Sequence, residues 1–269
     1  MSARRRISRI AFATGVNPNQ LARFLRGLPY FFADRRKFRQ MWKNSNSRSS
    51  FAFKYSTPMS GDRFEHAGSV RGHYFIQDLH VAQRIFHRDP VRHIDVGSRI
   101  DGFVSHVASF RTLDVIDVRH LETPHPNIQF HQGDLTNLDP TWFESTDSLS
   151  CLHALEHIGL GRYGDPLDPD GWERGLEFLA KMLKPDGILY LSVPTGVTQR
   201  VEFNSQRVFE VTALSETLGT NFSVENLWLI SEDGVLTEVE TLGLVEASVA
   251  KVSEHDCSVW ELRKLPTRV

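Results

Sequence analysis

The sequence predicts an α/β fold: a mostly parallel sheet covered by helices, preceded by a basic helical arm. Three observations predict it. Short apolar segments alternate with helical segments between residues 92 and 218, which favours parallel strands with helices on both faces. Two strand-like segments in the tail, 224–230 and 258–264, have no long helix between them and suit an antiparallel edge pair. The basic residues are concentrated in the first 50 positions.

The N-terminal part has its own composition. Residues 44–50 read Asn-Ser-Asn-Ser-Arg-Ser-Ser and predict a flexible joint. We therefore expect two parts, an arm and linker over 1–50 and a larger domain over 51–269. Residues 51–70 show no sustained period and are expected to be loop.

The elements of the larger domain follow in order from residue 71. Apolar residues at helical spacing, beginning with Phe75 and Leu79, predict a helix over 71–88 that ends at Asp89-Pro90. Five parallel strands are predicted at 92–96, 113–117, 127–131, 148–153 and 188–193. Four further helices are predicted near 101–110, 139–145, 171–183 and 208–218. With the two tail strands, the sheet has seven strands.

The composition bounds the class of protein. The chain has 269 residues, of which 40% are hydrophobic and 24% charged, as in ordinary soluble globular proteins. No apolar run approaches the roughly 18 residues that a membrane span needs. Two cysteines are too few for a disulfide framework or a thiolate zinc site. With no secretory signal apparent, we expect a cytoplasmic protein.

Charge is segregated along the chain. Residues 1–50 hold twelve Lys and Arg against one acid, a net charge of +11, which leaves −13 for the remainder. Seven large aromatic side chains are interleaved with the arginines. Through residues 1–43 the arm suits an anionic membrane surface, which would place the protein at the inner face of the membrane. Alternatives are packing of the arm on the domain or on a second subunit of a homo-oligomer, and nucleic acid, for which no binding motif is present.

Polar residues follow the predicted strands where ligands bind in such sheets. Gly97 allows a sharp turn after the first strand, and a helix begins directly after it. Asp117 ends the second strand, 22 residues beyond Asp95, where a carboxylate can accept both hydroxyls of a ribose. Asp134 follows the third strand and is placed for adenine contacts.

The turn after the first strand distinguishes between nucleotide ligands. A dinucleotide fingerprint needs a second glycine close to a pyrophosphate, and Arg99 stands at that position. No Gly-Lys-Ser/Thr follows, so a phosphate-binding P-loop is absent as well. A nucleoside ligand without phosphates fits better, and S-adenosylmethionine is the obvious one.

The sequence resembles the class I S-adenosylmethionine-dependent methyltransferases over residues 92–194. Five segments carry the resemblance: Asp95-Val-Gly-Ser, Asp117, Gly133-Asp134, the stretch 148–157 that ends Leu-Glu-His, and the stretch 183–194 that begins Leu-Lys-Pro-Asp-Gly. The family usually has Gly-x-Gly-x-Gly after the first strand, whereas Arg99 and Asp101 occupy its second and third glycine positions here. The resemblance implies a Rossmann-like class I methyltransferase fold.

Residues 95–104 and 157–166 look like a smaller branch of this superfamily, described as a domain of unknown function. Its bacterial members are commonly associated with surface-polysaccharide genes. This resemblance implies methylation of a sugar or glycan acceptor.

The family resemblance also implies a set of cofactor-binding positions. The residues expected around the methionine part, the ribose and the adenine of S-adenosylmethionine are Gln77, Asp95, Gly97, Ser98, Gly102, Asp117, Val118, Asp134, Leu135 and His153.

A hydroxyl acceptor needs a base, because it is not ionised at neutral pH. His157 is the first choice, since an imidazole titrates near working pH. Glu156 is the second choice; its alternative role is an internal hydrogen bond that supports the turn. Asp165 is the third.

The long stretch 158–171 suits a substrate-contacting loop. Arg162 and Tyr163 in this loop, with Arg200 and Asn204 from the loop after the fifth strand, are the expected acceptor contacts. Its three aspartates raise a magnesium hypothesis. Asp170 and Glu173 fit a helix capping box instead, so no metal site is predicted.

The expected function is thus S-adenosylmethionine-dependent O-methylation of a sugar or surface glycan. The alternative is a binding or scaffold protein that keeps the fold without catalysis, motivated by the altered glycine positions. A nicotinamide oxidoreductase is disfavoured by Arg99.

Overall fold

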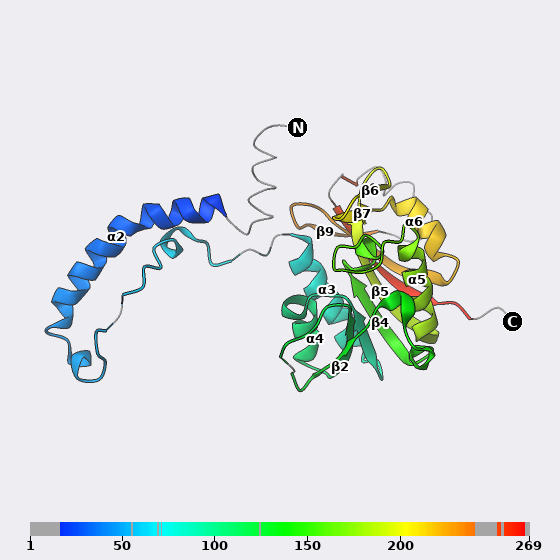
Figure 1. The fold of residues 1–269 in the computed structure, drawn as a ribbon, viewed down its shortest axis with the longest axis horizontal. Coiled ribbons are helices and arrows are strands. Elements are labelled where there is room, and N and C mark those ends of the chain that lie inside the picture. The colour runs from blue at the N-terminus through cyan, green and yellow to red at the C-terminus, as the bar shows by residue number, and fades with distance from the viewer. Residues whose placement is uncertain are drawn as a thin grey trace. The chain divides into compact units, whose positions relative to one another are not determined.

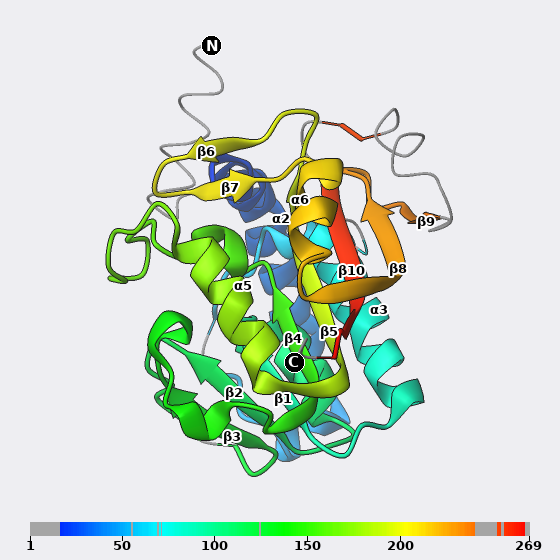
Figure 2. The same cartoon turned by 90° about the vertical axis from the view of Figure 1, so that its right-hand side faces the viewer.

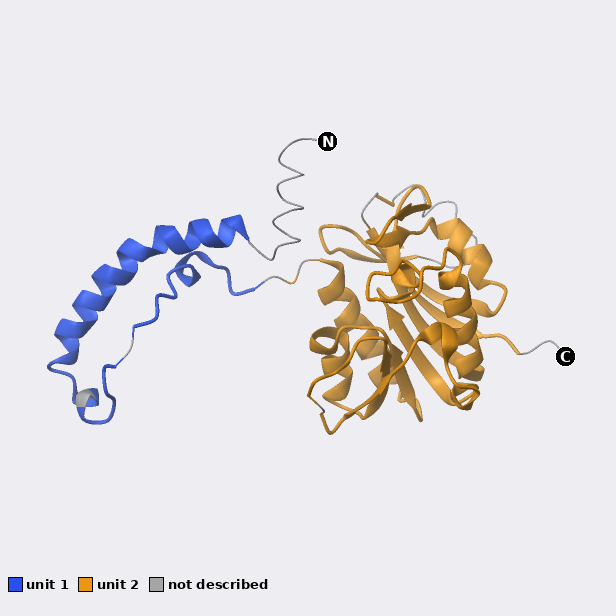
Figure 3. Cartoon of the chain, viewed as in Figure 1, with its two compact units in different colours: residues 1–69 blue, residues 70–269 orange. Residues whose placement is uncertain are grey.

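The computed structural model describes residues 17–54, 56–68, 70, 72–123, 125–239, 252–253 and 256–266. The chain forms two compact units, residues 1–69 and 70–269 (Figure 3). The boundary therefore lies at residue 69 rather than at the predicted residue 50. The predicted joint at 44–50 instead contains a short 3₁₀ helix, η1 (Asn46–Ser49), capped by the side chain of Ser45.

The described part of the first unit is built on the long helix α2 (Pro18–Trp42). Asn17 caps it by accepting hydrogen bonds from the backbone amides of Asn19 and Gln20. The following segment lies along this helix, because the Arg63 guanidinium pairs with Asp34 and the Ser60 hydroxyl donates to the carbonyl of Phe24. These contacts explain why residues 51–68 belong to this unit. They leave no periodic pattern in the sequence.

Close approach of this segment requires Gly27 on α2. A Cβ atom at this position would lie 1.9 Å from the carbonyl oxygen of Ser60. Among the described residues no helix is both long and apolar enough to cross a membrane.

The second unit contains an eight-stranded sheet of order β3-β2-β1-β4-β5-β10-β8-β9 (Figure 1). The first five strands of this order are parallel, and β10, β8 and β9 join antiparallel. Their bounds are β1 (His93–Val96), β2 (Leu113–Asp117), β3 (Ile128–Gln132), β4 (Thr146–Leu152), β5 (Leu183–Thr195), β8 (Phe222–Ile230), β9 (Leu236–Val239) and β10 (Asp256–Lys264). A separate hairpin joins β6 (Arg200–Glu202) to β7 (Gln206–Val208).

Helices cover both faces of the sheet. One face is covered by α5 (Gly171–Met182) and α6 (Val211–Leu218) (Figure 2). These helices form a buried apolar cluster with alternate strand residues such as Ile94 and Ile116. On the other face α3 (His73–Arg88), the wide helical turn η3 (Ile100–Val104) and α4 (Ser105–Ala108) pack on strand residues such as Val115. This is the predicted Rossmann-like arrangement.

The structure differs from the prediction in three elements. An eighth strand, β9, extends the sheet beyond the predicted seven, so the antiparallel part has three strands. The segment 139–145 forms only a 3₁₀ turn, η5 (Pro140–Trp142). The helix predicted at 208–218 begins at Val211, because the preceding residues pair in the β6–β7 hairpin.

Candidate active site

A pocket lies at the carboxyl ends of β1, β2, β3 and β4. It is lined by Val96, Gly97, Ile116, Asp117, Val118, Arg119, Gly133, Asp134, Leu135, His153, Ala154, His157, Ile158, Tyr163 and Asp165. Strand order explains the position, since β1 pairs with β2 on one side and with β4 on the other. This is the place where ligands bind in doubly wound sheets.

The turn after β1 forms one wall of the pocket. Gly97 has a φ of +74°, and a Cβ atom there would lie 2.7 Å from the Cβ of Ala154. Asp95 stabilises this turn by accepting hydrogen bonds from the backbone amide and hydroxyl of Ser98 and from the hydroxyl of Ser150. Asp95 and Ser98 are buried behind the wall and do not line the pocket.

Asp95 belongs to a buried polar chain between β1 and β4. His93 lies 2.8 Å from the hydroxyl of Ser148 and 3.1 Å from that of Ser150, which in turn donates to Asp95 at 2.5 Å. Burial lowers the pKa of His93 to about 3 and raises the pKa of Asp95 to about 7, although its hydrogen bonds oppose that rise. Folding therefore favours the protonated form of Asp95.

We predict that Asp95→Asn removes a pH dependence of stability. Because the folded-state pKa of Asp95 is raised, its protonated form stabilises the fold fully below about pH 4, and this contribution declines as the pH rises toward 7. Urea unfolding of the wild type should show this decline between pH 5 and 7, and Asp95→Asn should flatten it. Equal slopes in the two proteins would contradict the assignment.

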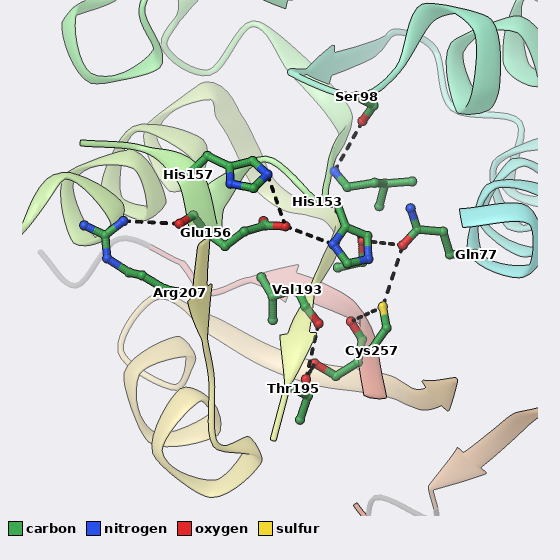
Figure 4. A network of polar contacts seen from close by, with 12 residues as sticks. Gln77, Ser98, His153, Glu156, His157, Val193, Thr195, Arg207 and Cys257 are labelled. Carbon is green, nitrogen blue, oxygen red and sulfur yellow. Dashed lines mark hydrogen bonds and ion pairs between the residues drawn. The ribbon is translucent and has the colours of Figure 1, made fainter. Parts of the chain in front are cut away.

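Two further predicted cofactor residues also lie outside the pocket lining. The Gln77 carboxamide accepts from the Ser192 hydroxyl at 2.7 Å and lies 3.7 Å from the Cys257 sulfur, deep in the structure (Figure 4). At Gly102 a Cβ atom would lie 2.7 Å from a carboxylate oxygen of Asp78, so a side chain would displace α3 or that carboxylate. Both residues support the packing beside the pocket.

Asp117, which is predicted to hold the ribose, lines the pocket, but its carboxylate already accepts hydrogen bonds. Both of its oxygens accept from the guanidinium of Arg119, at 2.9 Å and 2.5 Å, and one also accepts from the Arg119 backbone amide at 2.8 Å. The hydrogen bonds that Arg119 donates to the Asp117 carboxylate raise the pKa of Arg119. The guanidinium also lies over the ring of Tyr163, 4.8 Å from its centroid.

The opposite wall follows β3. Asp134 uses one carboxylate oxygen to cap the turn η4 (Leu135–Asn137) by accepting from the amide and hydroxyl of Thr136. Its second oxygen has no hydrogen bond within the described part of the chain. Val118, Leu135 and the missed Ile158 add apolar surface to the pocket.

The end of β4 brings three ionisable residues together (Figure 4). His153 has a φ of +52°, lines the pocket and places its Nδ1 atom 2.9 Å from Glu156. Burial opposes a charge on His153, but Cys257 and Glu156 raise its pKa well above the ordinary value. Glu156 is buried behind the wall and does not line the pocket, so it supports the turn, the alternative role predicted for it.

His157 lines the pocket and is only 7% exposed. Its Nε2 atom lies 3.7 Å from Glu156, and Nη1 of Arg162 lies 3.2 Å and 3.3 Å from its two ring nitrogens. Burial lowers the pKa of His157, Arg162 acts in the same direction and Glu156 opposes it. His157 is therefore neutral near pH 7 and able to accept a proton.

Asp165 shapes the loop that follows. Its carboxylate accepts from the backbone amides of Gly159, Gly161 and Tyr163 at 2.9–3.1 Å, so the loop wraps around it. It lines the pocket, as does Tyr163. Arg207, which sequence analysis missed, supports the loop by donating to the backbone carbonyls of four residues: Glu156, Ile158, Asp168 and Pro169.

The predicted capping box is wrong. Asp170 occupies the cap position of α5 but makes no capping hydrogen bond with its side chain. Asp168 instead accepts from the amide of Asp170 and pairs with Arg174. Within the described ranges, no group of three or more His, Cys, Asp or Glu is placed to hold a metal ion.

The two acceptor residues predicted after β5 do not line the pocket. Arg200 pairs with Glu202 on the β6–β7 hairpin, and the Asn204 amide is 3.5 Å from the carbonyl of Leu160. Arg162 is not in the lining either, but it contacts His157 and Tyr163. Arg119 is the main residue that sequence analysis missed; its position two residues beyond Asp117 was the available signal.

Comparisons with known proteins support the fold. Residues 128–222 match a family described as a Caenorhabditis protein of unknown function, DUF268. No curated protein matches the sequence. The [4+2]-cyclase SpnF has a similar structure, with a TM-score of 0.50 and 16% identity over 80% of this chain and 85% of that one.

A 1,6-didemethyltoxoflavin-N1-methyltransferase from Burkholderia thailandensis, bound to S-adenosylhomocysteine, gives a TM-score of 0.48 and 17% identity over 70% of this chain and 79% of its own. The N-methyltransferase NodS from Bradyrhizobium japonicum is also bound to S-adenosylhomocysteine. It gives a TM-score of 0.46 and 13% identity over 71% of this chain and 87% of its own. The likeness to SpnF, at a TM-score of 0.50, supports the Rossmann-like fold and nothing beyond the fold.

Proposed function

We propose that this protein binds S-adenosylmethionine and transfers its methyl group to an acceptor. One observation carries the proposal: a largely apolar pocket at the carboxyl ends of the parallel strands has the Asp117 carboxylate at the end of β2 and, after β3, an oxygen of Asp134 that accepts no hydrogen bond from the described residues. These groups suit the two ribose hydroxyls and the amino group of adenine. The residues therefore fit a nucleoside whose base is sandwiched between Val118, Leu135 and Ile158.

For methyl transfer, the protein has to align the acceptor with the methyl group, exclude water and remove one proton from the acceptor. When bound, S-adenosylmethionine supplies a methyl group already activated on a sulfonium. His157 is the base: it is neutral near pH 7, and its Nδ1 atom accepts the proton of the acceptor once the Arg162 guanidinium, whose Nη1 lies 3.3 Å from that atom, turns toward the acceptor. Tyr163 and Arg162 border this position and contact the acceptor.

A hydroxyl-bearing acceptor, of the sugar or glycan class, follows from the need for a base of this kind. An alcohol must lose its proton during transfer, and a neutral buried imidazole is suited to take it. The sequence resemblance to a branch associated with surface-polysaccharide genes points to the same acceptors.

Calorimetric titration with S-adenosylhomocysteine tests cofactor binding, with NADH as the control ligand. We expect saturable binding of the first and none of the second. Absence of binding up to about 1 mM would favour a scaffold that keeps the fold without the cofactor. The fold itself does not decide, because a [4+2]-cyclase shares it. Labelled S-adenosylmethionine with a panel of nucleotide sugars and glycans then identifies the acceptor.

We also propose that the first unit binds an anionic membrane surface from the cytoplasmic side. Three apolar side chains of α2 lie on one helical face and are exposed: Leu21 by 53%, Leu25 by 55% and Phe32 by 63%. Arg36 and Arg39 continue this face toward the end of the helix. Apolar side chains beside arginines suit the boundary between headgroups and acyl chains. Residues 1–16 of the arm lie outside the described residues.

We predict that the triple variant Leu21→Ser, Leu25→Ser, Phe32→Ser loses most of its sedimentation with phosphatidylserine vesicles. Each basic residue near such a surface contributes about 1 kcal/mol, so high salt should release the wild type as well. Val91→Ser, which changes an exposed apolar residue of the second unit, is the control and should sediment normally. Failure of the wild type to sediment at low salt would refute membrane binding.

A further inference from the structure

The ion pair between Asp117 and Arg119 occupies the atoms that the proposed ribose would need. Two guanidinium nitrogens and one backbone amide donate to the two oxygens of Asp117. This bidentate geometry is the strongest form of the arginine–carboxylate contact. A ribose that donates its two hydroxyls to Asp117 must therefore displace the Arg119 side chain.

The two partners differ in burial, which shows which one can move. The Asp117 side chain is 7% exposed, whereas that of Arg119 is 45% exposed. A buried carboxylate without donors is costly, but a guanidinium that turns outward is solvated by water. When ribose hydroxyls replace the Arg119 guanidinium, the Asp117 carboxylate still accepts hydrogen bonds.

Arg119 also connects Asp117 to the loop that carries the acceptor residues. Its guanidinium lies 4.8 Å from the centroid of the Tyr163 ring, and Arg162 lies 5.3 Å from the same ring. Asp117, Arg119 and Tyr163 all line the pocket. The Arg119 side chain thus spans from the ribose position to the loop after β4.

We propose that Arg119 is an internal competitor for the cofactor: by binding Asp117 it closes the ribose position of the pocket, and it must be displaced when the cofactor binds. The inference rests on the proposed cofactor. It predicts that removing the charged Arg119 side chain from the wall of the pocket raises the affinity for the cofactor. An arginine that contacts the ligand would have the opposite effect.

The chain offers a matched control in Arg99. Its guanidinium also makes a bidentate pair with an aspartate two residues away, Asp101, at 3.1 Å and 2.9 Å. The Arg99 side chain is 58% exposed and that of Asp101 is 76% exposed, and neither residue lines the pocket. Arg99→Gln removes the same charge and the same kind of ion pair without freeing Asp117.

The test measures the affinity for S-adenosylhomocysteine by calorimetry in five full-length proteins: wild type, Arg119→Gln, Arg99→Gln, Asp117→Ala and Asp117→Ala/Arg119→Gln. Arg119→Gln should bind about threefold to tenfold more tightly than wild type, the range for a partly exposed charged pair. Arg99→Gln should match wild type. In the Asp117→Ala background, the Arg119 substitution should add nothing, because its target is already gone.

A salt series on the wild type tests the same point without a substitution. Salt screens the Asp117–Arg119 pair, so the affinity for the zwitterionic S-adenosylhomocysteine should rise with salt in wild type and stay flat in Arg119→Gln. Unchanged or weaker binding by Arg119→Gln overturns the proposal, as does equal strengthening by Arg99→Gln. If neither wild type nor Arg119→Gln binds the ligand, the proposed cofactor itself is wrong.

Discussion

Replacing His157 with alanine should lower turnover about a hundredfold while cofactor affinity stays close to that of the wild type. Loss of a general base typically costs this much, because the acceptor hydroxyl then has to transfer its proton to water. His157 is the side chain on the pocket wall with the required properties: it is buried, its pKa is lowered and Glu156 lies behind its Nε2 atom. In the proposed mechanism, Glu156, 3.7 Å from Nε2, stabilises the imidazolium that proton transfer would create.

The pH profile of turnover provides a second readout of the same role. Only neutral His157 accepts a proton, so turnover should rise with pH through the lowered pKa of His157 and be level above the ordinary value of 6.5. This acid limb should disappear in His157→Ala. His131→Ala is the control, since His131 pairs with Asp114 outside the pocket and its side chain is 41% exposed.

A different outcome would reassign the base. If His157→Ala loses cofactor binding or fails to fold, the residue is structural. Asp165 is then the next candidate, because it lines the pocket whereas Glu156 does not. Its three backbone donors would have to be replaced if it left the loop, so Asp165→Asn should also perturb that loop.

Asp117→Ala should weaken the binding of S-adenosylmethionine at least tenfold while the fold survives. The substitution removes two charge-assisted hydrogen bonds to the ribose, each worth about 1.5–3 kcal/mol before the competing contact with Arg119 is displaced. That displacement makes the net loss smaller than the sum of the two bonds. Asp117 lies at the open end of β2, so its removal leaves the core packing intact.

Asp117→Asn is the matched variant for this measurement. It keeps the shape and one acceptor oxygen but removes the charge, so its affinity should fall between those of wild type and Asp117→Ala. Calorimetry gives the dissociation constants, and thermal unfolding checks the fold. A dissociation constant that does not change in Asp117→Ala would exclude this residue from the site.

Much of the fold follows from local patterns in the sequence. β2 has the predicted bounds, and each of the other parallel strands overlaps its predicted range, because short segments with apolar residues at alternate or successive positions mark buried strands. The carboxyl ends of parallel strands meet at one edge of the sheet. The sequence could therefore place Asp117, Asp134, His153 and His157 around one pocket.

Other features depend on contacts between distant segments. β9 is short and its side chains are at most half-buried, so no periodic pattern marks it. Residues 51–68 pair with α2 through ion pairs and hydrogen bonds that have no sequence period. Of the residues around the pocket, Asp95, Gln77 and Glu156 face the interior, where they satisfy buried hydroxyl, thiol and imidazole groups.

By itself, the sequence determined the order of strands and helices along the chain and the polar residues that follow the strands. Both depend on the local alternation of apolar and polar positions. The tertiary structure alone decided which of those residues face the pocket and which satisfy the interior. It also decided that Arg119 holds Asp117 and reaches Tyr163 on a loop 44 residues further along the chain. Side-chain direction at a strand end depends on the donors and acceptors that neighbouring strands supply, and these become neighbours only when the chain folds.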